Sequence, residues 1–198
     1  MITYDFELSD FQKTAIKAIE EGDHVLITAH TGSGKTLPAE HAIQYFAQKG
    51  KKVIYTAPIK ALSNQKYNEF QIKFPNISFG ILTGDIKFNP EADVLIMTTE
   101  ILKNTLYLKR LKQVEALDFE MDIENDLGCV VFDEVHYIND RDRGKVWEET
   151  IILLPSQIQM LMLSATIDKP ENFANWIETT KKTEQYQKKV ILTGTHQR

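Results

Sequence analysis

The sequence predicts an α/β fold in which helices cover both faces of a mostly parallel central sheet. Short β-branched runs recur along the chain, and helical patterns separate them, as expected for strand-helix-strand units. The runs are nearly continuous in apolar residues, which is typical of strands that are covered on both faces. A glycine-rich loop between the first run and the next helical pattern fits the same arrangement.

Seven runs are expected to form the strands of this sheet. In chain order they are residues 25–29, 53–57, 77–82, 94–98, 129–132, 160–163 and 190–192. The carboxyl ends of parallel strands share one edge, and sites in such sheets are built from the loops at that edge. Since the polar segments discussed below follow these runs, we expect them to meet on one rim.

Length and composition favour one globular domain over residues 1–198, with a core from about residue 6 to 193. The chain has 198 residues, of which 42% are apolar. Its net charge of −5 predicts no broad basic face, so any nucleic acid must be gripped locally. Cys129 is the only cysteine and lies in an apolar run, so we expect a buried core residue in a reducing, intracellular setting.

No segment resembles a signal peptide or a membrane span, which predicts a soluble protein without a membrane partner. The sequence does not separate nucleus from cytoplasm.

The segment from Leu117 to Leu127 breaks the pattern. Apolar residues alternate there with acids at a period of two, which predicts an exposed edge strand or hairpin arm protected by its charges. A docking strand for a protein partner is the less favoured alternative.

The glycine-rich loop has the residues of a phosphate-binding loop. Gly32 and Gly34 let the backbone aim successive N–H groups at phosphate oxygens, and the start of the next helix adds its positive end. Lys35 is expected to reach the β- and γ-phosphates, and Thr36 to offer its hydroxyl to Mg²⁺. Ala29 stands where the first glycine is usual. The expected phosphate-binding residues are Ala29, His30, Thr31, Gly32, Ser33, Gly34, Lys35 and Thr36.

Two acids supply the carboxylates that a nucleotide-hydrolysing site also needs. Asp133 and Glu134 follow the apolar run 129–132, so a buried strand is expected to deliver Asp133 to the metal held by Thr36. Glu134 is expected near the attacking water as a general base. Paired acids after a strand also occur as charges at a helix start, but the phosphate-binding loop makes that alternative weak.

Several ordered motifs resemble those of one helicase family. Residues 133–136, Asp-Glu-Val-His, look like the DExH box, and residues 164–166, Ser-Ala-Thr, look like the third motif of superfamily-two helicases. Residues 29–31, 58–67, 98–102 and 133–155 resemble the Ski-type, exosome-associated DExH-box RNA helicases. The resemblance covers about residues 6–177. It implies the first RecA-like domain of an ATP-dependent RNA helicase that moves from 3′ to 5′.

The resemblance implies further roles at the nucleotide. Phe6 is expected to stack on the adenine ring and Gln12 to bond its edge. His136 is expected to be catalytic together with Lys35, Asp133 and Glu134. It is also expected to link the hydrolysis site to Ser164 and Thr166, whose hydroxyls resemble the motif that couples ATP binding to nucleic-acid binding.

The same resemblance implies contacts with the backbone of single-stranded RNA. Small hydroxyls, helix-start amides and one lysine suit that task, because positioning on phosphates needs donors more than bulk charge. The expected RNA-binding residues are Pro58, Lys60, Ser63, Gly84, Thr99 and Glu100. Thr99 and Glu100 also suit an N-cap with an early acid, and both readings are compatible. Arg141, Arg143 and Glu148 are expected to form an exposed ion-pair network.

Two departures from the family pattern limit what it implies. The acidic segment, residues 113–127, looks like an insertion to which the family assigns no role. The 198 residues also lack the motifs of a second RecA-like domain, which we expect in cis with the arginine finger. Because such a finger is worth about 10³–10⁵ in rate, this domain alone is expected to hydrolyse ATP very slowly. An RNA-processing or degradation complex is a further expected partner.

Three alternatives stay open at this point. A DNA helicase or translocase of the same superfamily would show the same phosphate contacts, because the 2′-OH is what separates RNA from DNA. A non-catalytic RNA-binding module could retain the nucleotide residues as a relic of the fold. A P-loop kinase leaves residues 133–136 and 164–166 unexplained.

Overall fold

The computed structural model describes residues 2–136 and 141–195, and for residues 114 and 141–144 it describes the backbone alone. In this part of the chain eight strands form one sheet, in the order β4-β3-β5-β2-β6-β7-β1-β8. The strands are β1 (His24–Thr28), β2 (Lys52–Ala57), β3 (Phe79–Leu82), β4 (Lys87–Phe88), β5 (Val94–Thr98), β6 (Leu127–Phe132), β7 (Gln159–Ser164) and β8 (Val190–Gly194).

All seven predicted runs form strands, with ends that differ by at most two residues. Every pairing is parallel except that of β3 with β4, which is antiparallel. The predicted mostly parallel sheet is therefore confirmed. Strand β4 was not predicted, because its two residues are both exposed and form no apolar run.

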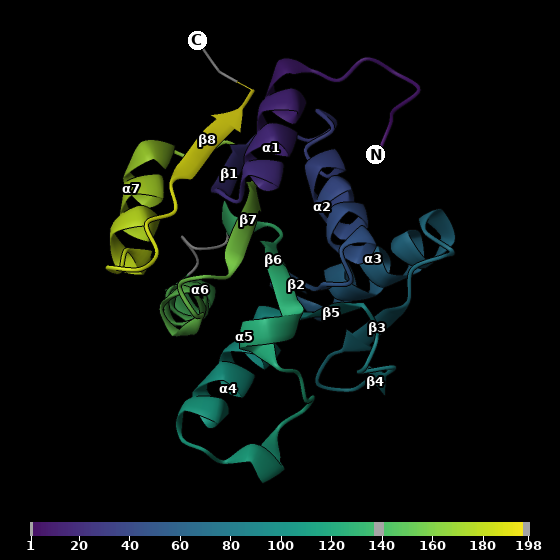
Figure 1. Ribbon diagram of the computed structural model, residues 1–198, viewed down its shortest axis with the longest axis vertical. Helices are drawn as coiled ribbons and strands as arrows, with labels where there is room; N and C mark the ends of the chain where they lie inside the picture. Colours follow the sequence, from purple (N-terminus) through teal and green to yellow (C-terminus); the bar gives the residue numbers. More distant parts are fainter. Residues whose placement is uncertain (1, 137–140, 196–198) are drawn as a thin grey trace.

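Helices cover both faces of the sheet, as predicted (Figure 1). Helices α1 (Asp10–Glu21), α2 (Leu37–Gln48) and α3 (Lys60–Lys73) pack on one face. Helices α4 (Thr99–Arg110), α6 (Arg141–Leu153) and α7 (Pro170–Lys181) pack on the other. The short helices η1 (Val114–Ala116) and α5 (Ile123–Asp126) lie between α4 and β6 in the chain.

Two hydrophobic cores explain why the strands are apolar throughout. In β2, Val53 and Tyr55 belong to the cluster beneath α1, α2 and α3, whereas Ile54 belongs to the cluster on the opposite face. Successive side chains of a strand point to opposite faces, so a strand covered on both sides needs an apolar residue at every position. Cys129 is buried in the first of these clusters, as expected.

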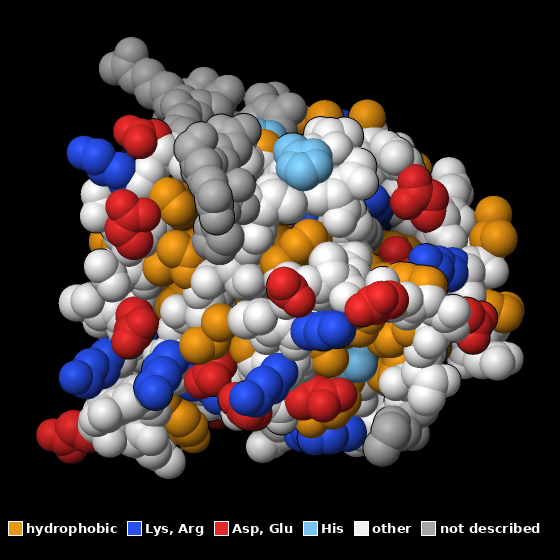
Figure 2. Space-filling model, turned by 90° about the horizontal axis from the view of Figure 1, so that it is seen from above, with side chains coloured by type: hydrophobic (Ala, Val, Ile, Leu, Met, Phe, Trp, Pro, Cys, Tyr) orange, Lys and Arg blue, Asp and Glu red, His pale blue; other side chains and the backbone are white. Residues whose placement is uncertain are grey.

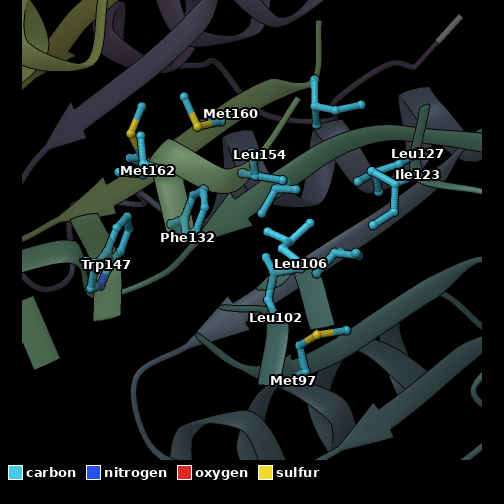
Figure 3. Packing of buried hydrophobic residues seen from close by; sticks show 14 of the residues in the cluster. Met97, Leu102, Leu106, Ile123, Leu127, Phe132, Trp147, Leu154, Met160 and Met162 are labelled. Carbon is cyan, nitrogen blue, oxygen red and sulfur yellow. The ribbon is translucent and has the colours of Figure 1, made fainter. Parts of the chain in front are cut away.

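The expectation for the acidic segment is wrong. Residues 117–126 form a bend followed by α5, and they contain no strand. Strand β6 begins at Leu127, the last residue of the segment. Phe119, Met121 and Ile123 are only 2%, 8% and 5% exposed and join the core beside α4 and α6. Figure 3 shows Ile123 close to Leu127 in that cluster.

The alternation of this segment has a different cause. An irregular chain lying on a core can also bury every second residue and leave the acids between them in solvent. The backbone is held by local side chains, since Lys109 donates to the carbonyl of Met121 at 2.7 Å and Asp122 caps α5 through the N–H of Asn125. The segment therefore covers one side of the core with mostly irregular structure.

No helix in the described ranges is both long and apolar enough to cross a membrane.

Candidate nucleotide and nucleic-acid site

The phosphate-binding loop connects the end of β1 to the start of α2. Gly32 and Gly34 have φ angles of +84° and +85°, a left-handed conformation that glycine adopts without strain. Ala29 is fully buried in the core, its φ is not positive, and its N–H donates to the carbonyl of Ser164 at 3.0 Å. An alanine in place of the usual first glycine is therefore compatible with this loop.

Gln12 ties the beginning of α1 to the same loop. Its side-chain Nε2 donates to the carbonyl of Gly34 at 3.0 Å, and its Oε1 accepts from the N–H of Ser9 at 2.9 Å. Phe6 leaves 56% of its surface exposed, so its ring is open to stacking. The structure thus joins Gln12 to the phosphate-binding loop, whereas the ring contact recorded for Phe6 is with Tyr4, at 5.8 Å between centroids.

Lys35 and Thr36 occupy the junction of the loop with α2. The Nζ of Lys35 lies 3.4 Å from the carbonyl oxygen of Ala29. Thr36 is the N-cap of α2, yet its side chain makes no capping hydrogen bond, so its hydroxyl is not used by the helix. Both side chains lie at the positive end of a twelve-residue helix, where an anion is stabilised.

His30 is joined to the residue that follows β8. Its backbone N–H donates to Thr195 Oγ1 at 3.2 Å, and its ring Nδ1 lies 3.1 Å from the same oxygen. Ser33 donates to the carbonyl of His30 at 2.6 Å. No local sequence pattern indicates the contact with Thr195, because 165 residues separate the partners.

Asp133 is held by two donors at the end of β6. Its side chain is only 3% exposed. Oδ1 accepts from the N–H of Glu134 at 2.8 Å, and Oδ2 accepts from the hydroxyl of Tyr55 at 2.5 Å. Burial raises the pKa of Asp133, while the hydrogen bond from Tyr55 and the charge of Lys66 act to lower it.

Tyr55 is a residue that the sequence analysis missed. Its ring is fully buried, and burial together with the charge of Asp133 raises its pKa well above 10, so the hydroxyl remains a donor. The available signal was a hydroxyl-bearing aromatic residue within an otherwise aliphatic part of the predicted strand 53–57. A buried tyrosine usually finds a partner for its hydroxyl.

Glu134 and His136 form a hydrogen-bonded pair beside Asp133. His136 Nε2 lies 2.9 Å from Glu134 Oε2, and His136 Nδ1 accepts from the N–H of Ala165 at 3.1 Å. Because Nδ1 accepts from a backbone N–H, the neutral ring carries its proton on Nε2 and donates it to Glu134. Glu134 has a φ of +57°, a strained conformation of the kind found at functional sites.

The predicted coupling residues flank this contact. His136 reaches the backbone of Ala165, which lies between Ser164 and Thr166. Ser164 is buried, with its hydroxyl bonded to the carbonyl of Ala165 at 2.7 Å, whereas Thr166 is exposed. Since the carbonyl of Ser164 also accepts from Ala29, a short path of hydrogen bonds joins Glu134 to the phosphate-binding loop.

The two predicted metal ligands, Thr36 at the start of α2 and Asp133 after β6, have side chains that suit Mg²⁺. Thr36 and Asp133 offer a hydroxyl and a carboxylate, the hard oxygen ligands that Mg²⁺ prefers. Among the residues that the structure describes, no group of three or more His, Cys, Asp or Glu side chains could hold a metal by itself. One carboxylate and one hydroxyl match a metal whose other ligands are phosphate oxygens and water.

A separate cavity of about 610 Å³ opens at the ends of β2, β3 and β5. Five of the six predicted RNA-binding residues line it, namely Pro58, Lys60, Gly84, Thr99 and Glu100. Lys60 forms an ion pair with Asp85 at 2.8 Å, and Thr99 donates to the carbonyl of Ala57 at 3.3 Å. Asn104 and Trp147 also line the cavity, and the sequence analysis did not select either of them.

Ser63 lies apart from this cavity. Its side chain is fully buried, and its hydroxyl donates to the carbonyl of Ile59 one turn earlier at 3.3 Å. In this structure it therefore supports the start of α3 and offers no exposed donor. The side chains of Arg141 and Arg143 lie outside the described residues, and Glu148 is exposed on α6.

Acidic and basic side chains of the described residues are interspersed over the face seen in Figure 2, and those coloured there form no extended basic patch. This distribution agrees with the net charge of −5 and with local gripping of any nucleic acid.

Comparison with known proteins places this geometry in a family. The sequence model of the DEAD/DEAH box helicases matches residues 9–173, which include the phosphate-binding loop, the Asp133–His136 box and residues 164–166. The chain belongs to the DEAD/DEAH box helicase family. The similarity to Ski-type DExH-box helicases inferred from the motifs is confirmed by individual members of this family.

Three relatives among the DEAD/DEAH box helicases are each 46% identical to the chain. Antiviral helicase SKI2 of Saccharomyces cerevisiae aligns over 99% of the chain, superkiller complex protein 2 of Homo sapiens over 96%, and ATP-dependent RNA helicase mtr4 of Schizosaccharomyces pombe over 88%. The alignments cover only 14%, 14% and 16% of these relatives, so the chain corresponds to a small part of their length.

Solved structures support the RecA-like helicase fold. The helicase Lhr of Mycobacterium smegmatis, bound to single-stranded DNA and AMP-PNP, matches 96% of this chain and 26% of its own, with a TM-score of 0.73 and 26% identity. The helicase MrfA bound to DNA matches 95% of this chain with a TM-score of 0.71, and its 20% identity makes it evidence for the fold alone.

Proposed function

We propose that this chain is the first RecA-like domain of an ATP-dependent RNA helicase, which couples ATP hydrolysis to translocation along single-stranded RNA from 3′ to 5′. The observation that carries the proposal is the path from Glu134 through His136 to Ala165. The path joins Glu134, which would activate water, to residues 164–165. The carbonyl of Ser164 in turn accepts from the N–H of Ala29 in the phosphate-binding loop. Such a path is suited to sensing the state of the nucleotide.

The proposed chemistry divides among residues on one rim. The backbone of residues 29–34 and the ammonium of Lys35 bind the phosphates, and Phe6 and Gln12 bind the base. Thr36 and Asp133 would hold Mg²⁺, which when bound would supply positive charge beside the phosphates. Glu134 accepts the proton of the attacking water, and His136 orients Glu134 by donating to Oε2.

The cavity beside α4 is proposed to hold the sugar-phosphate backbone. Pro58, Lys60, Gly84, Thr99 and Glu100 would position the strand through hydroxyls, helix-start N–H groups and one ammonium group. Ser63 takes an indirect part, because its buried hydroxyl supports Ile59 at the cavity wall. Relatives named as RNA helicases support RNA as the substrate class.

A second RecA-like domain in cis is part of the proposal, since the relatives are far longer than this chain. It would complete the nucleotide cleft and supply an arginine finger, so residues 1–198 alone would turn over slowly. A relative named superkiller complex protein 2 supports assembly into an RNA-processing or degradation complex.

The proposal is tested by nucleotide binding with the 198-residue chain and by single-turnover hydrolysis with the helicase that includes the proposed second RecA-like domain. Wild type should bind a fluorescent ATP analogue more tightly with Mg²⁺ than with EDTA, and Glu134→Gln should retain this binding while hydrolysis falls. If neither the removal of Mg²⁺ nor the Lys35→Ala substitution changed the affinity for the nucleotide, the proposed ATP site would be excluded. That result would favour a non-catalytic module.

A DNA helicase is the second candidate, and one observation favours it. The structural neighbour Lhr, at 26% identity, is bound to single-stranded DNA. Matched single strands of RNA and DNA separate the two candidates, because they differ at the 2′-OH. Tighter binding of the DNA strand, or binding unaffected by Lys60→Ala in the cavity, would overturn the RNA proposal.

A further inference from the structure

The hydroxyl of Tyr55 meets the carboxylate of Asp133 in a fully buried contact between neighbouring strands. Tyr55 lies on β2, and Asp133 follows β6, which pairs with β2 in register at Tyr55 and Val131. The backbone N–H of Asp133 also donates to the carbonyl of Thr56 at 2.8 Å. The position of Asp133 is thus fixed to β2 through both its main chain and its side chain.

The tyrosine ring has little freedom to move. It is fully buried in the cluster beneath α2 and α3 and meets the ring of Phe70 edge-on, with centroids 5.2 Å apart. Its hydroxyl therefore acts as a donor at a fixed point in the wall of the nucleotide site. Asp133 is the partner that the structure gives this hydroxyl, at 2.5 Å.

The carboxylate of Asp133 receives one donor on each oxygen. Glu134 N–H binds Oδ1 at 2.8 Å, and Tyr55 binds Oδ2. The first bond joins two adjacent residues, so by itself it does not fix the orientation of the carboxylate plane. The second comes from another strand, so together they fix the plane of the carboxylate and which of its lone pairs remain for a metal.

We infer that Tyr55 is a positioning residue for magnesium, acting by holding the carboxylate of Asp133 in the orientation that binds the ion. The inference rests on the proposed function, because it takes Asp133 as the metal ligand. Groups that orient metal ligands through hydrogen bonds typically change metal affinity by about 10- to 100-fold when removed. Tyr55 touches no substrate in this scheme and acts only through Asp133.

The test measures the Mg²⁺ concentration that half-saturates the tight binding of a fluorescent ATP analogue to the 198-residue chain. Tyr55→Phe removes only the hydroxyl. It should raise this concentration about tenfold or more, while affinity measured in EDTA stays unchanged. Tyr67→Phe is the matched control, because Tyr67 packs against the same cluster and its hydroxyl has no hydrogen bond within the described ranges.

Two further variants separate positioning from loss of stability. Tyr55→Met also lacks the hydroxyl donor, but its side chain packs differently. The inference is supported if Tyr55→Phe and Tyr55→Met raise the half-saturating Mg²⁺ concentration equally while their midpoints of urea unfolding differ. The inference would be overturned if the half-saturating Mg²⁺ concentration rose in proportion to the loss of stability measured by urea unfolding. In the background of Asp133→Ala, adding Tyr55→Phe should produce no further change in the Mg²⁺ requirement, and an equal loss in both backgrounds would also overturn it.

The outcome for wild type separates this inference from the proposed function. Absence of any Mg²⁺-dependent nucleotide binding by wild type would sink the proposed function. Normal Mg²⁺ dependence in wild type with an unchanged value in Tyr55→Phe would sink only the role of Tyr55.

Discussion

Gln12 and Gly34 are joined by a hydrogen bond of 3.0 Å that ties the start of α1 to the phosphate-binding loop. The two residues are also in close packing contact, because a Cβ added at position 34 would lie 2.6 Å from Gln12 Nε2. The backbone conformation thus favours glycine at position 34, and a Cβ there would also displace the amide of Gln12 from its hydrogen bond.

Gly34→Ala should therefore destabilise the chain more than the same change at Gly32 or Gly50. All three have positive φ, but a Cβ at Gly32 or Gly50 would meet nothing within 4 Å. Left-handed strain costs an alanine about 1–2 kcal/mol, and the contact with Gln12 adds to it only at position 34. Urea unfolding of the three variants measures the difference. Equal losses at all three positions would show that the contact with Gln12 is unimportant.

Glu134→Gln should lower single-turnover hydrolysis of ATP by about 10²–10⁴-fold, because the amide cannot accept the proton of the attacking water. The affinity for the nucleotide with Mg²⁺ should stay near that of wild type. Glu148→Gln is the control, since this acid is exposed on α6. A Glu134→Gln variant that hydrolyses ATP at the wild-type rate would remove Glu134 from the proposed role.

Phe119→Ala should lower the free energy of unfolding by about 3–5 kcal/mol, as for other buried aromatic side chains. The residue is 2% exposed and belongs to the core, although acids flank it on both sides. Glu120→Gln, a change at the exposed neighbour, should have almost no effect. Chemical denaturation of both variants checks the prediction. A stable Phe119→Ala variant would favour the exposed edge strand that the alternation first indicated.

Stability should fall as the pH decreases from about 6.5 to 4, and His24 should cause part of the loss. Burial, helped by the charges of Lys188 and Lys181, lowers the pKa of His24 to about 4. Below its unfolded pKa of about 6.5 the unfolded chain takes up a proton that the folded chain does not, so folding becomes less favourable, by about 3 kcal/mol when the pH has reached 4.

His24→Asn provides the check on this prediction. The ring Nδ1 accepts from the N–H of Met160 at 3.0 Å, and an asparagine side-chain oxygen can replace that acceptor without titrating. Urea unfolding at pH 7 and pH 4.5 should show a smaller pH dependence for the variant. Some dependence should remain, because burial also lowers the pKa of His41. An unchanged pH dependence would rule out His24 as a contributor.

The sequence alone determined seven of the eight strands that the structure describes, the mostly parallel sheet and the loops that carry the site. These features depend on local patterns, since a strand covered on both faces must be apolar at every position and a left-handed loop favours glycine. It also selected five residues that the structure brings together on one cavity, at the ends of three different strands. The resemblance to the DExH-box RNA helicases selected these residues, and the rule that parallel strands end on one rim predicted that their loops would meet.

Only the tertiary structure decided which partners these residues have. The bond from Tyr55 to Asp133 spans 78 positions and that from His30 to Thr195 spans 165, so no local pattern could reveal them. The acidic segment was misassigned for the same reason, because a period of two shows which side chains face a core but not whether a neighbouring strand is present. Burial of Ser63 likewise depends on how α3 packs on the sheet, which is decided by contacts between segments distant in the chain.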